Sequence, residues 1–235
     1  MQGSAEHIQT VFCFSKTGRM EKYDAHKQRV EGEGMIRILC ADISSADDQI
    51  YGLLYEKATP ERKSQADRYP RQEDKLRCVT ADALLKKALS SEEYRVRKND
   101  FGKPYIKDRE DFFYSLSHSG RYVVIAWGDT EVGVDVQRQD ASVNREAIAS
   151  RFFASDEQAY ARGDILRFFE IWTKKESYLK YTGRGLRLDL RSFSVLSPEP
   201  GIRYEHRMLK AGYSLSLCMM DKEYTFTQLD IRQLR

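Results

Sequence analysis

The stretch Val132-Gly133-Val134-Asp135-Val136-Gln137 alternates apolar and polar residues in the manner of a β-strand. Successive side chains on a strand point to opposite faces, so the three valines share one face. Asp135 and Gln137 share the other face with Gly133, roughly 7 Å from each other and near enough to flank one ion. Gly133 would leave room for a ligand to approach. A half-exposed strand with polar residues facing solvent explains the same pattern, and is the commoner case for such a stretch alone.

A second stretch, Trp172-Thr173-Lys174-Lys175-Glu176-Ser177-Tyr178-Leu179-Lys180, lies in a pattern that predicts a helix over 164–181. Its apolar stripe consists of Ile165, Phe168, Phe169, Trp172 and Leu179. Glu176 falls within that stripe, with Lys180 one turn further on. An ordinary Glu–Lys pair is worth only about 0.2–0.5 kcal/mol, and it leaves a carboxylate facing apolar surface. A metal ion bound by Glu176 resolves this conflict and leaves Lys180 to bind a phosphate.

Oxygen ligands of this kind favour Mg²⁺, which binds through few carboxylates and completes its shell with water and substrate phosphates. Asp135 and Glu176 fit that description, with Gln137 as a third candidate ligand. The sequence has no histidine cluster that would suggest zinc. The four cysteines (Cys13, Cys40, Cys78, Cys218) are scattered and predict reduced thiols in a cytoplasmic protein.

The composition is that of an ordinary soluble protein. Of 235 residues, 41% are hydrophobic and 32% are charged, and the net charge of +3 is too small to argue for nucleic acid. No apolar run is long enough to span a bilayer, and the N-terminus lacks the continuous apolar stretch of a secretory signal. We therefore expect neither a membrane nor a nucleic acid as partner.

The order of predicted elements indicates an α+β fold. Residues 1–34 are polar, contain several glycines and show no sustained period, so they are expected to form an extension that is disordered or only locally ordered. The remainder divides into an N-terminal subdomain, 35–140, and a C-terminal subdomain, 141–235. Strands are predicted at 35–43, 112–116, 122–127, 132–136, 193–195, 213–218 and 224–229, with two short strands around the turn at Gly102. A helix capped by Ser44 or Ser45 is predicted to run through Ile50, Leu53 and Leu54, and further helices are predicted at 61–69, 71–89, 145–162 and 164–181. Gly128-Asp129 favours a hairpin between the strands at 122–127 and 132–136.

Two further features are compatible with an anionic ligand. Ser117, His118 and Gly120 make a turn rich in hydrogen-bond donors, although a lone histidine at a strand end is more often structural. Basic residues also gather before residue 104, although a run of charges is usually a solvated helical face. These residues are Arg62, Lys63, Arg68, Arg71, Arg77 and Lys103.

Taken together, four motifs in this order resemble the Sfp-type 4′-phosphopantetheinyl transferases. They are Phe101-Gly102-Lys103-Pro104, Ser115-Leu116-Ser117-His118-Ser119-Gly120, Gly133-Val134-Asp135-Val136, and Trp172 to Lys180 leading to Gly185-Leu186. Each motif is weak alone, but the four at this spacing are specific, and the resemblance covers most of the chain from about Met35. The segment Arg151-Phe152-Phe153 before Glu157 also fits.

The resemblance implies a reaction: the phosphopantetheine arm of coenzyme A moves onto a serine of an apo carrier protein, and 3′,5′-ADP is released. It implies Mg²⁺ between Asp135, Glu176 and the coenzyme A pyrophosphate, with Lys180 neutralising charge. It further implies a monomer with pseudo-twofold symmetry that binds coenzyme A between its halves. Arg62, Lys103, Ser117 and His118 match coenzyme A-binding positions, Arg62 at the 3′-phosphate. Glu176 is the family-like base for the serine, and Glu157 is a weaker candidate.

The chain departs from the family pattern at Gln137, where many members have a second carboxylate. An amide oxygen can bind Mg²⁺ but carries no charge, so the role of Gln137 stays open. Two other functions compete: a metal-dependent nucleotide phosphohydrolase that uses Asp135 and Glu176, and a non-catalytic nucleotide- or RNA-binding module. Carriers of peptide synthetases, polyketide synthases and fatty-acid synthases all suit the resemblance, docking on basic and apolar surface after Gln137.

Overall fold

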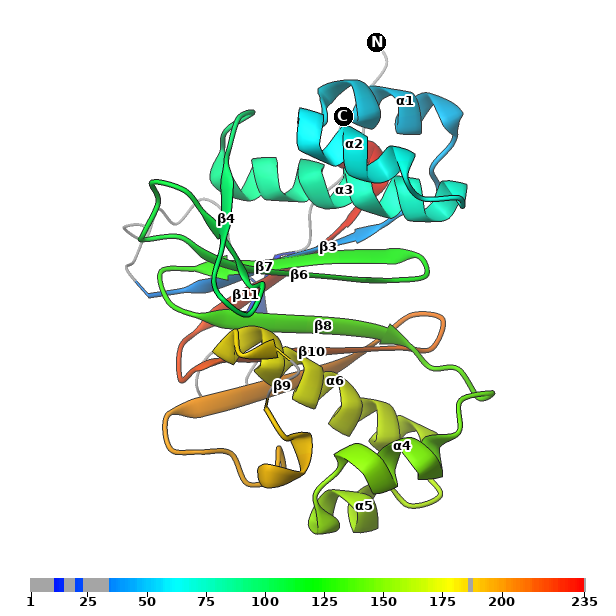
Figure 1. Ribbon diagram of the computed structural model, residues 1–235, viewed down its shortest axis with the longest axis vertical. Coiled ribbons are helices and arrows are strands. Elements are labelled where there is room, and N and C mark those ends of the chain that lie inside the picture. Colours follow the sequence, from blue (N-terminus) through cyan, green and yellow to red (C-terminus); the bar gives the residue numbers. More distant parts are fainter. Residues whose placement is uncertain (1–10, 15–19, 23–33, 186–187, 235) are drawn as a thin grey trace.

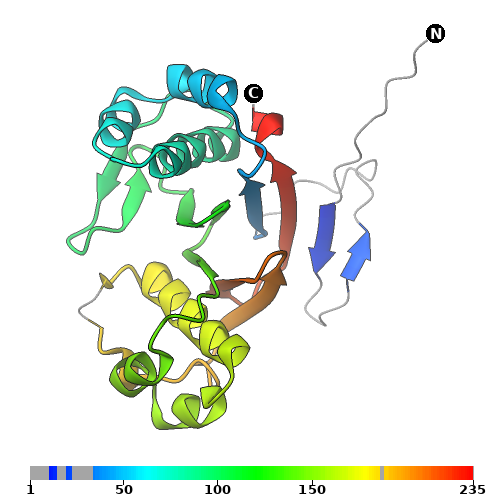
Figure 2. The same cartoon turned by 90° about the vertical axis from the view of Figure 1, so that its right-hand side faces the viewer.

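Two sheets, each covered by one long helix, give an α+β fold of two subdomains (Figure 1). The computed structural model describes residues 11–14, 20–22, 34–185 and 188–234. Figure 2 shows helices α1, α2 and α3 in its upper part and α4, α5 and α6 in its lower part, with the strands between them. Among the described residues, no helix combines the length and the apolar character needed to cross a membrane.

The larger sheet has the strand order β2-β1-β11-β3-β7-β6. Its central strand β3 pairs in parallel with β11 and antiparallel with β7, and β6 pairs with β7 through a tight turn at Gly120. Helix α3 packs on β3 and β7, while α1 and α2 pack against α3. The strands are β1 (Val11–Phe14), β2 (Met20–Lys22), β3 (Ile36–Asp42), β6 (Phe113–Ser119), β7 (Tyr122–Gly128) and β11 (Tyr224–Asp230); the helices are α1 (Asp48–Lys57), α2 (Pro60–Asp67) and α3 (Gln72–Leu89).

The smaller sheet has the order β8-β10-β9, and α6 packs across one face of it. Its strands are β8 (Val132–Arg138), β9 (Ile202–Leu209) and β10 (Tyr213–Met220), and its helices are α4 (Arg145–Phe152), α5 (Ser155–Ala161) and α6 (Ile165–Thr182). A two-stranded hairpin, β4 (Val96–Lys98) and β5 (Pro104–Ile106), projects from the N-terminal half, and 3-10 turns cover Leu190–Ser192 and Ile231–Leu234.

Helix ends follow local chemistry. Pro60 begins α2 after Thr59, whose hydroxyl accepts a hydrogen bond from the Arg62 N–H. Asp164 caps α6 by accepting from the N–H groups of Leu166 and Arg167. Gly183 ends α6 with a φ of 62°, a conformation that a glycine adopts without strain.

Most of the predicted elements are confirmed, but the hairpin predicted at Gly128-Asp129 is wrong. Strand β7 pairs with β3 and β6, whereas β8 pairs with β10 in the other sheet. The chain therefore leaves the first subdomain at residues 129–131, and β11 returns to it at the end. A boundary at residue 140 does not match this exchange of strands between the sheets.

Smaller differences have local causes. The helix predicted at 145–162 is two helices, because Phe153 and Ala154 adopt extended backbone between α4 and α5. The cap of α1 is Asp47, which accepts from the Ile50 N–H, so Ser44 and Ser45 do not cap it. Residues 193–195 form no strand, and β9 was not predicted. The expectation for residues 1–34 falls largely outside the described residues, although 11–14 and 20–22 form β1 and β2.

Candidate functional site

Strand β8 places its alternate residues as its sequence predicts. Val132, Val134 and Val136 are buried in the core between the two sheets. Gly133 lies on the opposite face, where a Cβ atom would stand 1.9 Å from the Ser177 carbonyl oxygen of α6. The open space at Gly133 is therefore filled by helix α6, and the prediction that it admits a ligand is wrong. The glycine lets α6 approach β8 closely, which brings Asp135 and Glu176 to the same site.

The two carboxylate oxygens of Asp135 have different surroundings. Oδ1 accepts hydrogen bonds from the Ser117 hydroxyl at 2.8 Å and from the Lys180 ammonium at 2.7 Å. Oδ2 is buried and has no hydrogen-bond partner among the described residues. A buried oxygen of a carboxylate without a partner is costly unless a ligand completes it. The side chain as a whole is 9% exposed, so such a ligand would have to enter the protein.

Glu176 reaches the same place from α6. Its side chain is half-buried, and it makes no hydrogen bond or ion pair within the part of the chain that the structure describes. Burial raises the pKa of Glu176, the negative charge of Asp135 raises it further, and Lys180 opposes both. The two carboxylates are thus close enough to repel each other, which is the electrostatic condition that a cation relieves.

Lys180 stands beside both acids. Its ammonium donates to Asp135 Oδ1 and, at 3.0 Å, to the Val134 carbonyl oxygen. An ammonium has three hydrogens, so one remains for a further acceptor. The side chain is 31% exposed, which keeps this third hydrogen accessible to a ligand.

These residues fit a Mg²⁺ ion better than a transition metal. Asp135 and Glu176 supply hard oxygen ligands, and Gln137 lies on the same face of β8 as Asp135, half-buried and with no side-chain hydrogen bond to any described residue. Across the described residues, no group of three or more histidine, cysteine, aspartate or glutamate side chains is gathered to hold a metal. The site thus lacks the dense carboxylate set of a two-metal phosphohydrolase and would rely on substrate oxygens.

Three serines join β6 to β8 where the two sheets meet. The hydroxyl oxygens of Ser115, Ser117 and Ser119 accept hydrogen bonds from the N–H groups of Val134, Val136 and Arg138 at 3.0, 3.2 and 3.0 Å. Ser117 therefore holds both the strand and the carboxylate of Asp135. Sequence reasoning missed Ser115 and Ser119, although their Ser-x-Ser-x-Ser spacing places all three on one face of a strand.

His118 points to the other face of β6 and is exposed. Partial desolvation lowers its pKa, and the positive charges of Arg77 and Lys180 add to this effect. The Arg77 guanidinium donates to the Gly120 carbonyl oxygen at 2.9 Å, which fixes it beside the turn that follows His118. The structure thus brings His118, Arg77 and Lys180 together, a set of donors suited to phosphate oxygens.

Lys103 is placed differently from the expectation for a ligand-binding lysine. Its side chain is buried, with the ammonium paired to Glu131 and donating to the carbonyl oxygens of Val132 and Tyr181. All three ammonium hydrogens are directed to protein oxygens, and burial lowers the pKa of Lys103. The ammonium therefore ties the 99–104 turn to the C-terminal end of α6.

Arg62 lies on α2, far in sequence from Asp135, Glu176 and Lys180. In space it lies close to Tyr114 of β6. Its guanidinium stands 4.0 Å from the buried carboxylate of Asp82 and donates to Gln65 at 3.2 Å. Glu157, the weaker candidate for a base, is fully buried. It pairs with Lys175 at 2.8 Å and accepts from the N–H groups of Ala154 and Val195, so it is occupied within the core.

A pocket of about 340 Å³ opens beside Glu176 and Lys180. Its wall combines the 101–104 turn, the edge of β6 at 114–116 and the end of α6, and it includes Phe101 and Leu116. Lys103 contributes only its stem to this wall, because its ammonium is directed elsewhere. The pocket gives an extended molecule a mostly apolar space next to the two carboxylates.

Comparison with known proteins gives consistent matches. The family model described as "4'-phosphopantetheinyl transferase superfamily" matches residues 131–228. The chain is 33% identical over 159 residues to 4'-phosphopantetheinyl transferase Sfp of Bacillus subtilis (strain 168), which is 61% of this chain and 68% of that protein. It is 28% identical over 227 residues to 4'-phosphopantetheinyl transferase gsp of Aneurinibacillus migulanus, 85% of this chain and 94% of that protein. It is 32% identical over 157 residues to 4'-phosphopantetheinyl transferase ffp of Bacillus subtilis, 60% of this chain and 67% of that protein.

Proposed function

Since the chain belongs to the 4′-phosphopantetheinyl transferase superfamily, we propose that it transfers the phosphopantetheine arm of coenzyme A to a serine of an apo carrier protein. The observation that carries this proposal is the meeting of Asp135 on β8 and Glu176 on α6, the helix that packs on that strand, beside Lys180. The serine oxygen would bond to the phosphorus that bears pantetheine, the pyrophosphate bond would break, and 3′,5′-ADP would leave.

The acidic residues would hold a Mg²⁺ ion together with the pyrophosphate of coenzyme A. The unpartnered Oδ2 of Asp135 and the carboxylate of Glu176 support this assignment, with Gln137 as a neutral third ligand. When bound, Mg²⁺ would neutralise charge on the pyrophosphate and on the 5′-phosphate of the departing 3′,5′-ADP. Phosphoryl transfer depends mostly on such positioning and charge stabilisation.

Two side chains would handle the remaining charge and the proton. Lys180 would give its third ammonium hydrogen to a pyrophosphate oxygen. Glu176 would accept the proton of the carrier serine, directly or through a water molecule, and its raised pKa suits a base. Ser117 would keep Asp135 in place, because its hydroxyl donates to Oδ1 of that residue. Its expected contact with coenzyme A would come in addition to this role.

The nucleotide of coenzyme A would lie along the cationic side of the cleft. His118 and Arg62 are proposed to contact its phosphates, Arg62 at the 3′-phosphate. Arg77 joins this set because it lies beside His118. Lys103 is proposed to support the site through the turn it anchors, since its ammonium is held by protein oxygens.

The carrier is proposed to dock on the surface that follows Gln137. Exposed Arg138 and Arg151 lie on or near this segment, and acidic carriers favour such basic surface. Carriers of peptide synthetases, polyketide synthases and fatty-acid synthases all remain candidates. We propose that the protein acts as a monomer in the cytoplasm.

The transfer is tested by incubating the protein with coenzyme A, Mg²⁺ and several apo carriers, followed by intact-mass analysis of each carrier. We expect the mass of the holo form for at least one carrier. A carrier whose acceptor serine is replaced by alanine is the control and should keep its apo mass. Absence of transfer to every carrier would overturn the proposal.

The metal assignment is tested by titrating coenzyme A into the protein with and without Mg²⁺ in a calorimeter. We expect Mg²⁺ to tighten the binding in the wild type, and to have little effect in Asp135→Asn. Equal tightening in both proteins would contradict the assignment of Asp135 as a ligand. Because this readout is binding, it does not depend on the choice of carrier.

A further inference from the structure

Asp82 on α3 is a buried carboxylate outside the cluster of Asp135 and Glu176. Its side chain is 2% exposed, yet its carboxylate is contacted from the start of α2, from Tyr94 before β4 and from its own helix. Oδ1 accepts from the Tyr94 hydroxyl at 2.5 Å and from the Thr59 hydroxyl at 3.2 Å, and it lies 4.0 Å from Arg62 Nε. Oδ2 lies 3.4 Å from the Lys86 ammonium, one turn along α3.

These contacts fix Arg62 in two ways. Thr59 donates to Asp82 and also caps α2 by accepting from the Arg62 N–H at 3.4 Å, so the carboxylate anchors the first turn of that helix. The carboxylate also attracts the Arg62 guanidinium directly. A long flexible side chain is thereby confined to one region of space before any ligand binds.

The charges of this cluster do not balance. Two cations, Arg62 and Lys86, share the single buried carboxylate of Asp82. Glu92 lies 3.8 Å from Lys86 but its side chain is 83% exposed, so solvent weakens that pair. The Arg62 side chain is 21% exposed, so an anion from solvent can reach it and complete the cluster.

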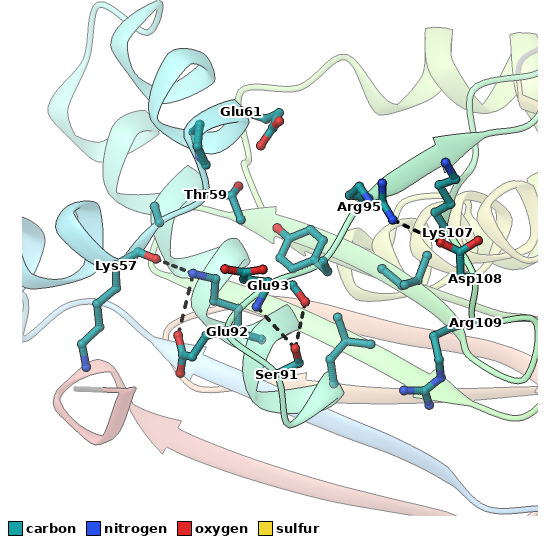
Figure 3. A pocket seen from close by; sticks show the side chains of 16 residues that line it. Lys57, Thr59, Glu61, Ser91, Glu92, Glu93, Arg95, Lys107, Asp108 and Arg109 are labelled. Atoms are coloured by element: carbon teal, nitrogen blue, oxygen red, sulfur yellow. Dashed lines mark hydrogen bonds and ion pairs between the residues drawn. The ribbon is translucent and has the colours of Figure 1, made fainter.

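Thr59, Lys86 and Tyr94 also line a pocket of about 760 Å³ at the N-terminus of α2 (Figure 3). Acidic side chains surround this pocket together with basic ones, as Glu61, Glu92, Glu93 and Asp108 show in Figure 3. The acidic side chains in the pocket wall offset the attraction of the basic ones, so the pocket as a whole is a poor site for a polyanion. The anion site is therefore assigned to Arg62 itself and not to this pocket.

We propose that Asp82 is a positioning residue that holds the Arg62 guanidinium to receive the 3′-phosphate of coenzyme A. This inference rests on the proposed function, and it adds Asp82, supported by Tyr94 and Thr59, to the residues that select the substrate. Its consequence is specificity: Asp82 should matter for coenzyme A and not for 3′-dephospho-coenzyme A, which lacks that phosphate.

The test compares the dissociation constants of coenzyme A and 3′-dephospho-coenzyme A for wild type, Asp82→Asn and Tyr94→Phe by calorimetry. The wild type should prefer coenzyme A, and each variant should lose about tenfold of that preference, the value of one charge-assisted hydrogen bond. Affinity for 3′-dephospho-coenzyme A should stay within about twofold of wild type. In an Arg62→Ala background, Asp82→Asn should change the preference no further.

Matched controls are Asp67→Asn and Tyr55→Phe. Tyr55 donates to Asp67 at 3.0 Å in the same subdomain, but neither side chain contacts Arg62. These variants lose a comparable pair and should keep the wild-type preference.

Equal weakening of both ligands, or an unchanged preference in a folded variant, would show a structural role only and overturn the inference. If Asp82→Asn does not fold, Tyr94→Phe decides, because it removes one hydroxyl and leaves the charges. A wild type that transfers phosphopantetheine but does not distinguish the two coenzymes overturns this inference and leaves the proposed function standing. A wild type that binds neither coenzyme overturns the proposed function, and the inference falls with it.

Discussion

The carboxylate of Asp135 divides its contacts unequally between its two oxygens, and this asymmetry is the best indication that the residue binds a ligand. Oδ1 is held by Ser117 and Lys180, whereas Oδ2 is buried without a partner among the described residues. A protein seldom leaves such an atom unpaired unless a ligand completes it. The neutral side chain of Gln137, two residues away, then sets how much negative charge the site offers to a cation.

Replacement of Gln137 by glutamate tests this point. Gln137→Glu should keep transferase activity and lower the Mg²⁺ concentration for half-maximal rate by up to about tenfold, because ligand charge tightens cation binding. The measurement is the transfer rate as a function of Mg²⁺ concentration. Gln139→Glu, which adds the same charge beyond the end of β8, should leave the Mg²⁺ requirement unchanged. Complete loss of activity in a folded Gln137→Glu protein would count against the assignment.

Asp230 gives a prediction for the pH dependence of stability. The hydrogen bonds from Arg232, together with that from Ser45, lower the pKa of Asp230 to about 2 from its ordinary value of 3.8. A carboxyl with a lowered pKa stabilises the fold above its unfolded-state pKa, and this contribution is lost as pH falls from about 4 to about 2. The stability difference between wild type and Asp230→Asn, measured by urea unfolding, should therefore shrink across this interval. Parallel stability curves for the two proteins would contradict the prediction.

Single residues were predictable where their side chain conflicts with a periodic pattern. Glu176 interrupts an apolar stripe, and this conflict singled it out; the structure places it beside Asp135 and Lys180. Asp82 was not found, because a charged residue in an amphipathic helix looks solvated until the partners from other elements are known. The same applies to Lys103, whose basic side chain suggested a ligand contact although its ammonium ties two elements together.

At the scale of elements, the close approach of β8 and α6 creates the site. The absence of a side chain at Gly133 allows the helix backbone to contact the strand. The Ser115, Ser117 and Ser119 hydroxyls then bind β8 from its other side, at the edge of β6. Strand β8 is thus fixed between helix α6 and strand β6 of the larger sheet, and this determines the direction of the Asp135 side chain.

A glycine pair tests this packing. Gly133→Ala should lower the free energy of unfolding by about 1–3 kcal/mol or more, because the added Cβ overlaps backbone atoms of α6 that cannot rotate away. Gly52→Ala is the matched control: a Cβ at Gly52 of α1 meets no atom within 4 Å. That variant should be stabilised by about 0.4–1 kcal/mol. Chemical unfolding measures both, and equal effects of the two substitutions would contradict the close packing.

Most elements were predictable from periodicity and breaker residues, including α3, α6 and the turn at Gly102. The hairpin between β7 and β8 was not, because a glycine-aspartate turn signals only that the chain changes direction. Which strand pairs with β8 depends on β10, which follows some 75 residues later and which no local signal identifies. The break between α4 and α5 was missed because Phe153 continues the apolar pattern while its backbone is extended.

At the scale of the whole molecule, the two sheets exchange strands. Strand β11 from the end of the chain pairs with β3, and β8 leaves the first half to pair with β10. Lys103 and Asn99 add a second connection, because their side chains donate to the carbonyl oxygens of Tyr181 and Gly183 at the end of α6. These links hold the first subdomain against the unit of β8 and α6 that carries Asp135 and Glu176.

Lys103→Met tests the link at the end of α6. The substitution keeps the apolar stem but removes the ammonium that donates to Glu131 and to two carbonyl oxygens, so the free energy of unfolding should fall by about 1–3 kcal/mol. Lys98→Met on the same hairpin is the control, since Lys98 is exposed and should change stability by less than about 0.5 kcal/mol. Urea unfolding midpoints distinguish the two. Identical midpoints for both variants would show that the Lys103 ammonium does not hold the halves together.

The α+β class of the whole molecule followed from the order of elements, but the boundary between the halves did not. Composition changes little near residue 140, and the strand exchange is a long-range property that only the pairing of β8 and β11 reveals. The expectation that the site lies between the halves came from the family resemblance, because no local pattern states which carboxylates will meet.

The central claim is that Asp135 and Glu176, brought together by the packing of α6 on β8, make one phosphopantetheine-transfer site. It is tested most directly by intact-mass analysis of an apo carrier after incubation with coenzyme A, Mg²⁺ and wild type, Asp135→Ala or Glu176→Ala. Circular dichroism establishes that each variant is folded. The predicted result is a holo carrier with wild type and an unchanged apo carrier with either variant. Formation of the holo carrier at the wild-type rate by either folded variant would contradict the claim.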